Sequence, residues 1–149
     1  MRAMSAETVR DAMVPEPTTL AADANAQDAG RCLADSGDVR AIFVTEDGGR
    51  LLGVVTRKTL VREVVAAGLD PGAVRLRAIA EPPNFTLDAG LELDGAFRLL
   101  EEQDLERVPV VEEGGRLVGV LSRAVVQRRL AEDEPPSEEE QPDAGSLVL

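Results

Sequence analysis

The side chains of this chain that could take part in chemistry are carboxylates, hydroxyls and arginines. Its 149 residues include 28 Asp and Glu, 16 Lys and Arg, no His and one cysteine, Cys32. Without His, a single chain cannot build a zinc site of the usual His and Cys kind, nor a Ser or Cys nucleophile activated by imidazole. An enzyme would need acids that converge with Ser or Lys in a pocket, so we expect a chain without catalytic activity.

Two hydroxyl residues, each followed by a cation, stand at matching points of the sequence. Thr56 and Ser122 both end an apolar run that starts with Gly, and both precede an arginine. A hydroxyl at such a strand-to-helix corner can cap the helix that follows, while a guanidinium suits phosphate oxygens. The nearby cations either bind phosphate or are solvated at the surface. They are Arg57, Lys58 and Arg40 in one half of the chain and Arg123 and Arg107 in the other.

The two corners belong to one unit that occurs twice. Residues 9–15 align with residues 76–82 at an offset of 67, and residues 49–57 align with residues 115–123 at an offset of 66. The change of one residue falls in the turn between two strands, where a change of length is tolerated because turns are exposed to solvent. Because an internal duplication decides the architecture, the chain should contain two similar units.

Each copy predicts the same order of elements. A short extended segment comes first, at residues 18–20 and 85–87. The helix after it should have Asp23 or Asp88 as its N-cap and should end near residue 36 or 103. The apolar face of the first of these helices is made of small residues, so another element must approach it closely.

Each copy continues with a predicted β-hairpin and a second helix. Apolar strands joined through a Gly-Gly turn indicate the hairpins. Since Pro109 lacks an amide hydrogen, its strand should lie at a sheet edge there. The hairpin strands are at residues 41–44 and 51–55 in the first copy and at residues 108–111 and 117–121 in the second.

The fold class expected from this order is α/β (α+β), with two tandem β-α-β-β-α repeats. One copy is too small to bury both faces of its sheet, so the repeats should pack with pseudo-two-fold symmetry as one globular module. We assign residues 1–73, with a lead-in helix, to the first repeat and residues 74–131 to the second. Residues 132–149 hold three prolines, seven acids and no Lys or Arg, which predicts an acidic disordered tail.

One stretch of the second copy carries a family pattern, Arg107-Val108-Pro109-Val110-Val111-Glu112 followed by Gly115 to Ser122. With the element order that occurs twice, it resembles a pair of CBS domains, the Bateman module, over about residues 7–131. The resemblance implies two clefts between stacked repeats, which in many members hold an adenosine nucleotide or S-adenosylmethionine and regulate an associated enzyme, channel or transporter. We therefore expect a regulatory sensor that requires no cofactor. Its regulatory ligand would be AMP, ADP, ATP or S-adenosylmethionine, and its regulated partner protein is unknown.

The family also implies an Asp, three residues after each corner hydroxyl, that binds both ribose hydroxyls. Here these positions hold Thr59 and Val125. Thr forms only neutral hydrogen bonds and Val forms none, so affinity for adenosine should fall about ten- to hundredfold, with the second cleft the weaker one. The candidate ligand-binding residues are Thr19, Ile42, Thr56, Arg57, Thr59, Phe85, Pro109, Ser122 and Arg123.

The alternative function is a ligand-free dimerisation or docking scaffold with vestigial clefts, which the missing carboxylates favour. A homodimer is expected because the family commonly pairs modules through helices, and the last helix of each repeat has more apolar residues than one internal face can bury. The net charge of −12 and the scarcity of aromatic residues argue against nucleic acid. No apolar run approaches the roughly 20 residues of a membrane span, and a lone cysteine fits a reducing compartment, so we expect a cytoplasmic protein without membrane insertion.

Overall fold

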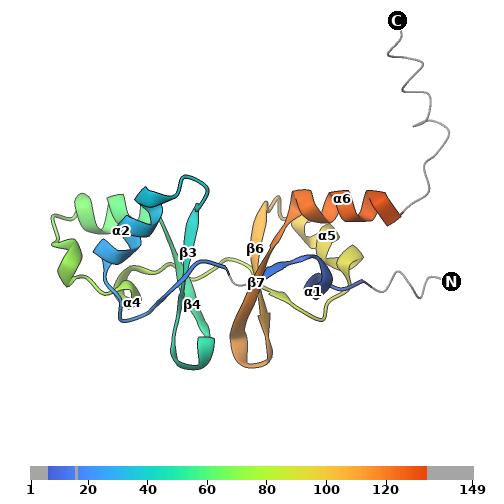
Figure 1. Cartoon of the computed structure of the whole chain (residues 1–149), viewed down its shortest axis with the longest axis horizontal. Coiled ribbons are helices and arrows are strands. Elements are labelled where there is room, and N and C mark those ends of the chain that lie inside the picture. The colour runs from blue at the N-terminus through green and yellow to red at the C-terminus, as the bar shows by residue number, and fades with distance from the viewer. Residues whose placement is uncertain (1–6, 16, 134–149) are drawn as a thin grey trace, which may run out of the picture.

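A computed structural model describes residues 7–15 and 17–133. Two sheets lie side by side at the centre of an elongated molecule, with most helices toward its two ends (Figure 1). The first half contains β2 (Thr19–Ala21), α2 (Ala26–Asp35), β3 (Ala41–Thr45), η2 (Asp47–Gly49), β4 (Leu51–Thr56), α3 (Arg57–Leu60), η3 (Val61–Val65) and η4 (Pro71–Ala73). The second half contains β5 (Leu87–Asp88), α5 (Leu93–Glu102), β6 (Arg107–Glu112), η5 (Glu113–Gly115), β7 (Arg116–Ser122) and α6 (Arg123–Asp133).

Short lead-in segments precede both halves. They are α1 (Val9–Ala12) with β1 (Val14–Pro15), and α4 (Leu76–Ile79). At the other end of the chain, α6 stops at Asp133, and the rest of the predicted acidic tail, residues 134–149, lies outside the described residues.

The two sheets share one design. In the first sheet β2 runs parallel to β3, which pairs antiparallel with β4; in the second, β5, β6 and β7 repeat this pattern and β1 joins the outer edge of β7. The hairpin turns place Gly48 and Gly114 at φ of 78° and 79°, which glycine adopts without strain. Both predicted hairpins are confirmed. Strand β6 lies inside its sheet, but β5 pairs with it only from Val110 onward, so Pro109 has no partner on that side.

Each repeat has its own hydrophobic core between its sheet and its helices. The small-residue face of α2 is covered by α3, because Leu60 Cδ1 lies 3.9 Å from where a Cβ on Gly30 would stand. This confirms that another element approaches that face closely. The buried faces of α2 and α5 have matching spacing, with Ala26, Ala29 and Leu33 in one helix and Leu93, Ala96 and Leu100 in the other.

The predicted N-caps are wrong, because both helices begin later than expected. Asn25 caps α2, and its side chain accepts a hydrogen bond from the amide of the third helical residue at 2.9 Å. Helix α5 begins after Glu92 without a side-chain cap. Asp23 lies in a turn instead, and Asp88 ends β5, where its side chain accepts a hydrogen bond from the Gly90 amide at 2.8 Å. Aspartate favours turns as much as caps, so the residue type alone does not separate the two.

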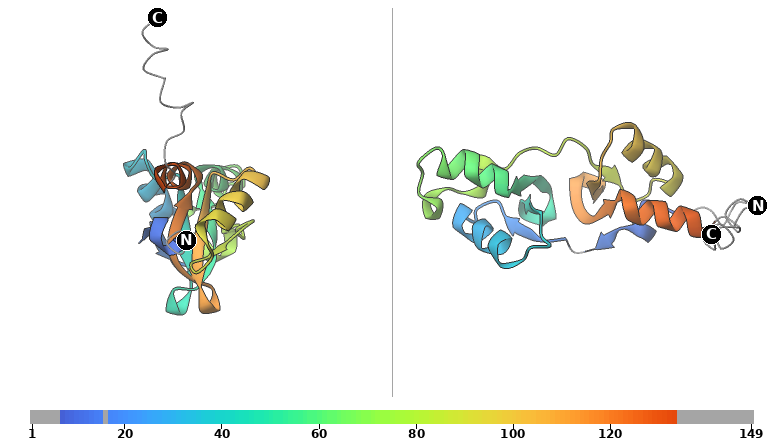
Figure 2. Two further views of the ribbon diagram at one scale, coloured as in Figure 1. Left: turned by 90° about the vertical axis from the view of Figure 1, so that its right-hand side faces the viewer. Right: turned by 90° about the horizontal axis from the view of Figure 1, so that it is seen from above.

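The lead-in helices are exchanged between the repeats. Helix α1 comes first in the chain but packs in the core of the second repeat, where Val9 is fully buried. Helix α4 packs in the core of the first repeat through Leu76, which is also fully buried. The Val9 amide donates to the Leu91 carbonyl at 2.9 Å, and the Leu76 amide donates to the Ala24 carbonyl at 2.8 Å. The repeats are therefore interlocked, and Figure 2 shows the chain passing between the halves.

The close approach of the lead-in segments explains the glycine of each corner motif. A Cβ on Gly53 would stand 2.7 Å from the Glu81 carbonyl oxygen, and one on Gly119 would stand 2.8 Å from that of Val14. No real side chain fits at such distances. The Gly that begins each apolar run is thus required by the packing of a segment from the other repeat.

Equivalent ion pairs hold the lead-in segments to the hairpins. Arg10 of α1 pairs with Glu112 at the end of β6, and Arg77 of α4 lies 3.9 Å from Glu46 just after β3. The hydrogen bond from Arg10 holds the pKa of Glu112 below its ordinary value. These two ion pairs occupy equivalent positions in the two repeats, so they follow the pseudo-two-fold symmetry of the backbone.

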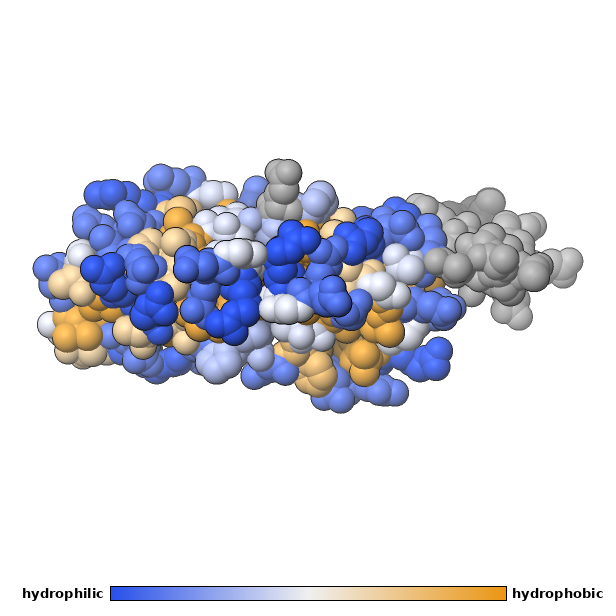
Figure 3. All heavy atoms as spheres, turned by 90° about the horizontal axis from the view of Figure 1, so that it is seen from below, coloured by the Kyte–Doolittle hydropathy of each residue, from blue (hydrophilic) through white to orange (hydrophobic). Residues whose placement is uncertain are grey.

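The surface seen from below is mostly hydrophilic. In this view, apolar side chains gather at the left end, which the first repeat forms, and along the lower edge of the second repeat (Figure 3). None of the helices in the described part of the chain is long and apolar enough to cross a membrane.

Candidate functional site

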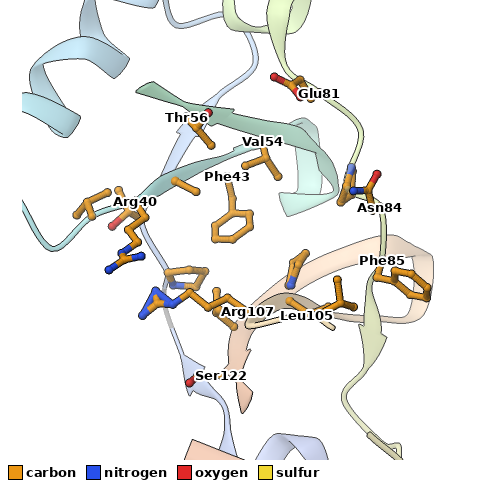
Figure 4. Close-up of a pocket in the computed structure, with 18 of the residues that line it drawn as sticks. Arg40, Phe43, Val54, Thr56, Glu81, Asn84, Phe85, Leu105, Arg107 and Ser122 are labelled. Atoms are coloured by element: carbon orange, nitrogen blue, oxygen red, sulfur yellow. The ribbon is translucent and has the colours of Figure 1, made fainter. Parts of the chain in front are cut away.

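A cavity of about 510 Å³ lies between the two repeats. Small-molecule sites in proteins have volumes of about 300–1,000 Å³. Both hairpins and both lead-in segments border the cavity, so each repeat supplies part of the wall (Figure 4). Its apolar lining includes Phe43 and Val54 from the first repeat, Phe85 from the segment after α4, and Pro109 and Val120 from the second repeat. The cavity therefore offers apolar surfaces against which a flat ring could pack.

Two arginines from equivalent positions meet at this cavity. Arg40 immediately precedes β3 and Arg107 begins β6, and both line the cavity. Figure 4 shows both arginines among the residues that line the cavity, one from each repeat. Neither guanidinium group forms an ion pair or hydrogen bond with any residue in the described part of the chain. Two such cations beside an apolar cavity have the chemistry that suits a phosphate or another anion.

A hydroxyl and carboxylate cluster borders another part of the cavity. Thr56 caps the helix that follows, accepting a hydrogen bond from the Thr59 amide at 3.2 Å. The fully buried Thr59 donates its hydroxyl to Glu81 Oε2 at 2.8 Å, and Arg62 donates to the same oxygen at 2.7 Å. The Thr59 hydrogen bond, followed by that from Arg62, holds the pKa of Glu81 below its ordinary value, so its carboxylate is ionised at neutral pH.

The equivalent corner of the second repeat has fewer polar side chains. Ser122 matches Thr56 and caps α6 weakly, with 3.4 Å between its hydroxyl and the Val125 amide. Val125 matches Thr59, and Val14 matches Glu81 in the aligned repeats. The second-repeat corner thus has the Ser122 hydroxyl but valines in place of Thr59 and Glu81, although the backbone is symmetric.

The structure brings together some of the predicted site residues at the cavity. Ile42 is fully buried in the first core, and Thr19 is exposed on β2 outside the cavity. The ligand contacts of the others stay a prediction. Those that line the cavity are Thr56, Thr59, Phe85, Pro109 and Ser122.

The two predicted arginines do not line the cavity. Arg57 donates hydrogen bonds to the backbone carbonyls of Leu33, Ser36 and Val39, which lie at and after the end of α2. Arg123 donates to the Leu100 carbonyl near the end of α5 and to a nearby Glu side chain. The last carbonyls of a helix lack partners within the helix and attract cations, so these arginines serve the helix ends.

Glu81 was missed by sequence reasoning. It lies in the segment between the repeats, far along the chain from the corner at Thr56, and nothing local marks it as a site residue. A signal does exist in the aligned repeats, because the polar pair Thr59 and Glu81 corresponds to the apolar pair Val125 and Val14. Such joint differences indicate that the two positions are in contact.

No group of three or more His, Cys, Asp or Glu side chains within residues 7–15 and 17–133 is placed to hold a metal ion.

Hypoxic response protein 1 of Mycobacterium tuberculosis is 34% identical over 95 residues, which span 64% of this chain and 66%, just under two thirds, of that protein. A crystal structure of hypoxic response protein I with two coordinated zinc ions has a TM-score of 0.70 and 29% identity, covering 83% of this chain and 98% of that one.

CBSX2, solved in complex with AMP, has a TM-score of 0.66 and 25% identity, and the match covers 84% of this chain and 96% of that one. The family model for the CBS domain matches twice, at residues 9–66 and 76–132. These two matches cover the same repeats that the duplicated sequence and the paired sheets delimit. The chain therefore belongs to the CBS domain family and contains two copies of that domain, packed as a pair.

Proposed function

We propose that this protein is a non-catalytic regulatory module that binds an adenosine nucleotide, AMP in the first instance, in the cavity between its repeats. The observation that carries the proposal is the pair of arginines, Arg40 and Arg107, which line the same apolar cavity from the two repeats and whose guanidinium groups have no partner among the described residues. In this arrangement the phosphate binds the two cations and the base packs against Phe43 and its apolar neighbours. The AMP complex of CBSX2 supports the choice of ligand.

Nucleotide binding at this cavity would depend on how the two repeats are arranged relative to each other. Arg40 comes from one repeat and Arg107 from the other, so one phosphate group bridges them. A ligand shifts a protein between two arrangements only by its difference in affinity for them. Bridging favours the arrangement in which the arginines are close, and a partner protein would respond to that change.

Calorimetry of the purified chain with AMP, ADP, ATP and S-adenosylmethionine tests this function. We expect saturable binding of AMP, and binding of adenosine at least about tenfold weaker, because adenosine lacks the group that the arginines bind. Equal affinity for adenosine and AMP would contradict the phosphate site. Absence of binding for the whole panel would refute nucleotide sensing.

The second candidate function is a docking scaffold without a ligand. It is favoured by Val14 and Val125, because the second-repeat corner lacks the Thr and Glu pair that the first repeat has there. The same calorimetric panel separates the two functions, because a scaffold would bind none of the compounds. The cytoplasmic location stays a prediction.

The module acts as a homodimer in this proposal. Val61, Val65 and Leu69 lie close together in sequence and are 57%, 70% and 51% exposed. They lie in and just after η3, beside an apolar groove between α2 and α3. Exposed apolar clusters of this kind mark protein interfaces. Light scattering should give twice the chain mass of 15.8 kDa, and Val65→Glu should shift the protein toward monomer. A monomeric wild-type protein at high concentration would contradict this.

A further inference from the structure

We propose that Glu81 is the residue that recognises the ribose of the bound nucleotide, through hydrogen bonds from the vicinal hydroxyls to its carboxylate. The inference rests on the proposed nucleotide function and adds a specificity-determining residue to it. Glu81 reaches the first repeat from the segment that leads into the second repeat. It thereby supplies a carboxylate beside Thr59, at a corner whose own sequence provides only hydroxyls.

The hydrogen bonds of Glu81 leave one of its oxygens for a ligand. Thr59 and Arg62 both donate to Oε2, at 2.8 Å and 2.7 Å. Among the described residues, Oε1 accepts no hydrogen bond. Glu81 also lines the cavity. An ionised carboxylate with one anchored oxygen and one available oxygen is well placed to accept strong hydrogen bonds from hydroxyl groups.

Thr59 cannot perform this role itself. Its side chain is fully buried, and its only hydroxyl hydrogen is donated to Glu81. The Thr59 oxygen also accepts the Thr56 amide at 3.0 Å. Thr59 therefore acts as a positioning residue, which fixes the direction of the Glu81 carboxylate from below the cavity surface.

The charges of the cavity then fix the direction of the nucleotide. Figure 4 shows Thr56 and Glu81 on one side of the cavity and Arg107 on the opposite side. The carboxylate repels a phosphate and attracts hydroxyl hydrogens, while the arginines do the reverse. A ribose phosphate satisfies both ends at once, whereas a free base or an inorganic phosphate satisfies only one.

The second repeat lacks an equivalent of the hydrogen-bonded pair Thr59 and Glu81. In the aligned repeats Val14 corresponds to Glu81, and Val125 corresponds to Thr59. The Val14 side chain is 56% exposed. A sugar on that side would lose its hydration without gaining a charged acceptor. The expected stoichiometry is one nucleotide per chain, although the fold has two equivalent sides.

The test compares Glu81→Gln with the matched control Glu63→Gln. Both residues bind Arg62, but Glu63 does not line the cavity. Calorimetry with AMP and with 2′-deoxy-AMP is run on each variant and on the wild type, and thermal unfolding confirms that each variant folds. We expect E81Q to weaken AMP binding about ten- to hundredfold and E63Q to leave it within about twofold of wild type.

The 2′-deoxy ligand provides the second readout. The wild type should prefer AMP to 2′-deoxy-AMP by about tenfold, and E81Q should lose most of that preference. Wild-type AMP affinity in E81Q, or an equal loss in E63Q, would overturn the role of Glu81 and leave the nucleotide site standing. A wild-type protein that binds neither compound would overturn the nucleotide site and the role of Glu81 together.

Discussion

Replacement of both Arg40 and Arg107 by Ala should weaken AMP binding by about a hundredfold or more and leave adenosine binding nearly unchanged. Each guanidinium contributes charge-assisted hydrogen bonds to the phosphate, worth about 1.5–3 kcal/mol per arginine. Because neither guanidinium group has a partner within residues 7–15 and 17–133, their removal leaves no charge of that part of the protein unpaired. Calorimetry with both ligands measures the effect directly.

A matched control is Arg128→Ala, which removes an exposed cation of α6 that does not line the cavity. It should not change AMP affinity beyond the small effect of one distant charge. AMP binding by the wild type should weaken as salt is added, and binding by the double variant should not. If the double variant kept wild-type affinity for AMP, the phosphate would lie elsewhere and the proposed orientation of the nucleotide would be wrong.

Leu76→Ala should lower the free energy of unfolding by about 2–5 kcal/mol, the range for truncation of a fully buried Leu. Leu76 is 0% exposed and lies in α4, which belongs to the second repeat in sequence but to the first core in space. The damage should therefore fall on the first repeat. Urea unfolding followed by circular dichroism gives the free energy, and hydrogen exchange shows where protection is lost.

The control is Glu102→Ala, at an exposed position of α5, which should change stability by no more than about 0.5 kcal/mol. In the Leu76 variant, amides of β3 and β4 should exchange faster than those of β6 and β7. Loss of protection first in β6 and β7 would mean that α4 supports its own repeat, contrary to the exchanged packing.

The sequence was most informative where one pattern determines one structure. The aligned halves predicted two similar units, and the Gly-Gly turns between apolar strands predicted both hairpins, because few other residues accept a positive φ. The helix starts were less certain, since Asp23 and Asp88 favour a turn and a cap equally. The exchange of α1 and α4 was not predictable, because Val9 and Leu76 would complete either core equally well and only the path of the connecting chain decides.

The site was predicted in part for similar reasons. Thr56 and Ser122 follow from their place at a corner between strand and helix, and both line the cavity. The arginines next to them turn back to carbonyl groups at the helix ends, while Arg40 and Arg107 reach the cavity from the start of a strand. Local sequence does not distinguish an arginine that binds a helix end from one that lines the cavity. The outcome depends on whether the end of the preceding helix lies within reach of the guanidinium.

The exchanged lead-in helices have a consequence for the origin of the fold. A chain of half this length, folded along the path seen here, would place its first helix in the core of another molecule and leave its own core incomplete. Two identical copies related by a two-fold axis would complete each other. The ancestral polypeptide was by this reasoning an obligate dimer, and fusion of two gene copies made the association independent of protein concentration. After fusion the halves could diverge separately, so that one corner of the cavity has a carboxylate and the other has valine.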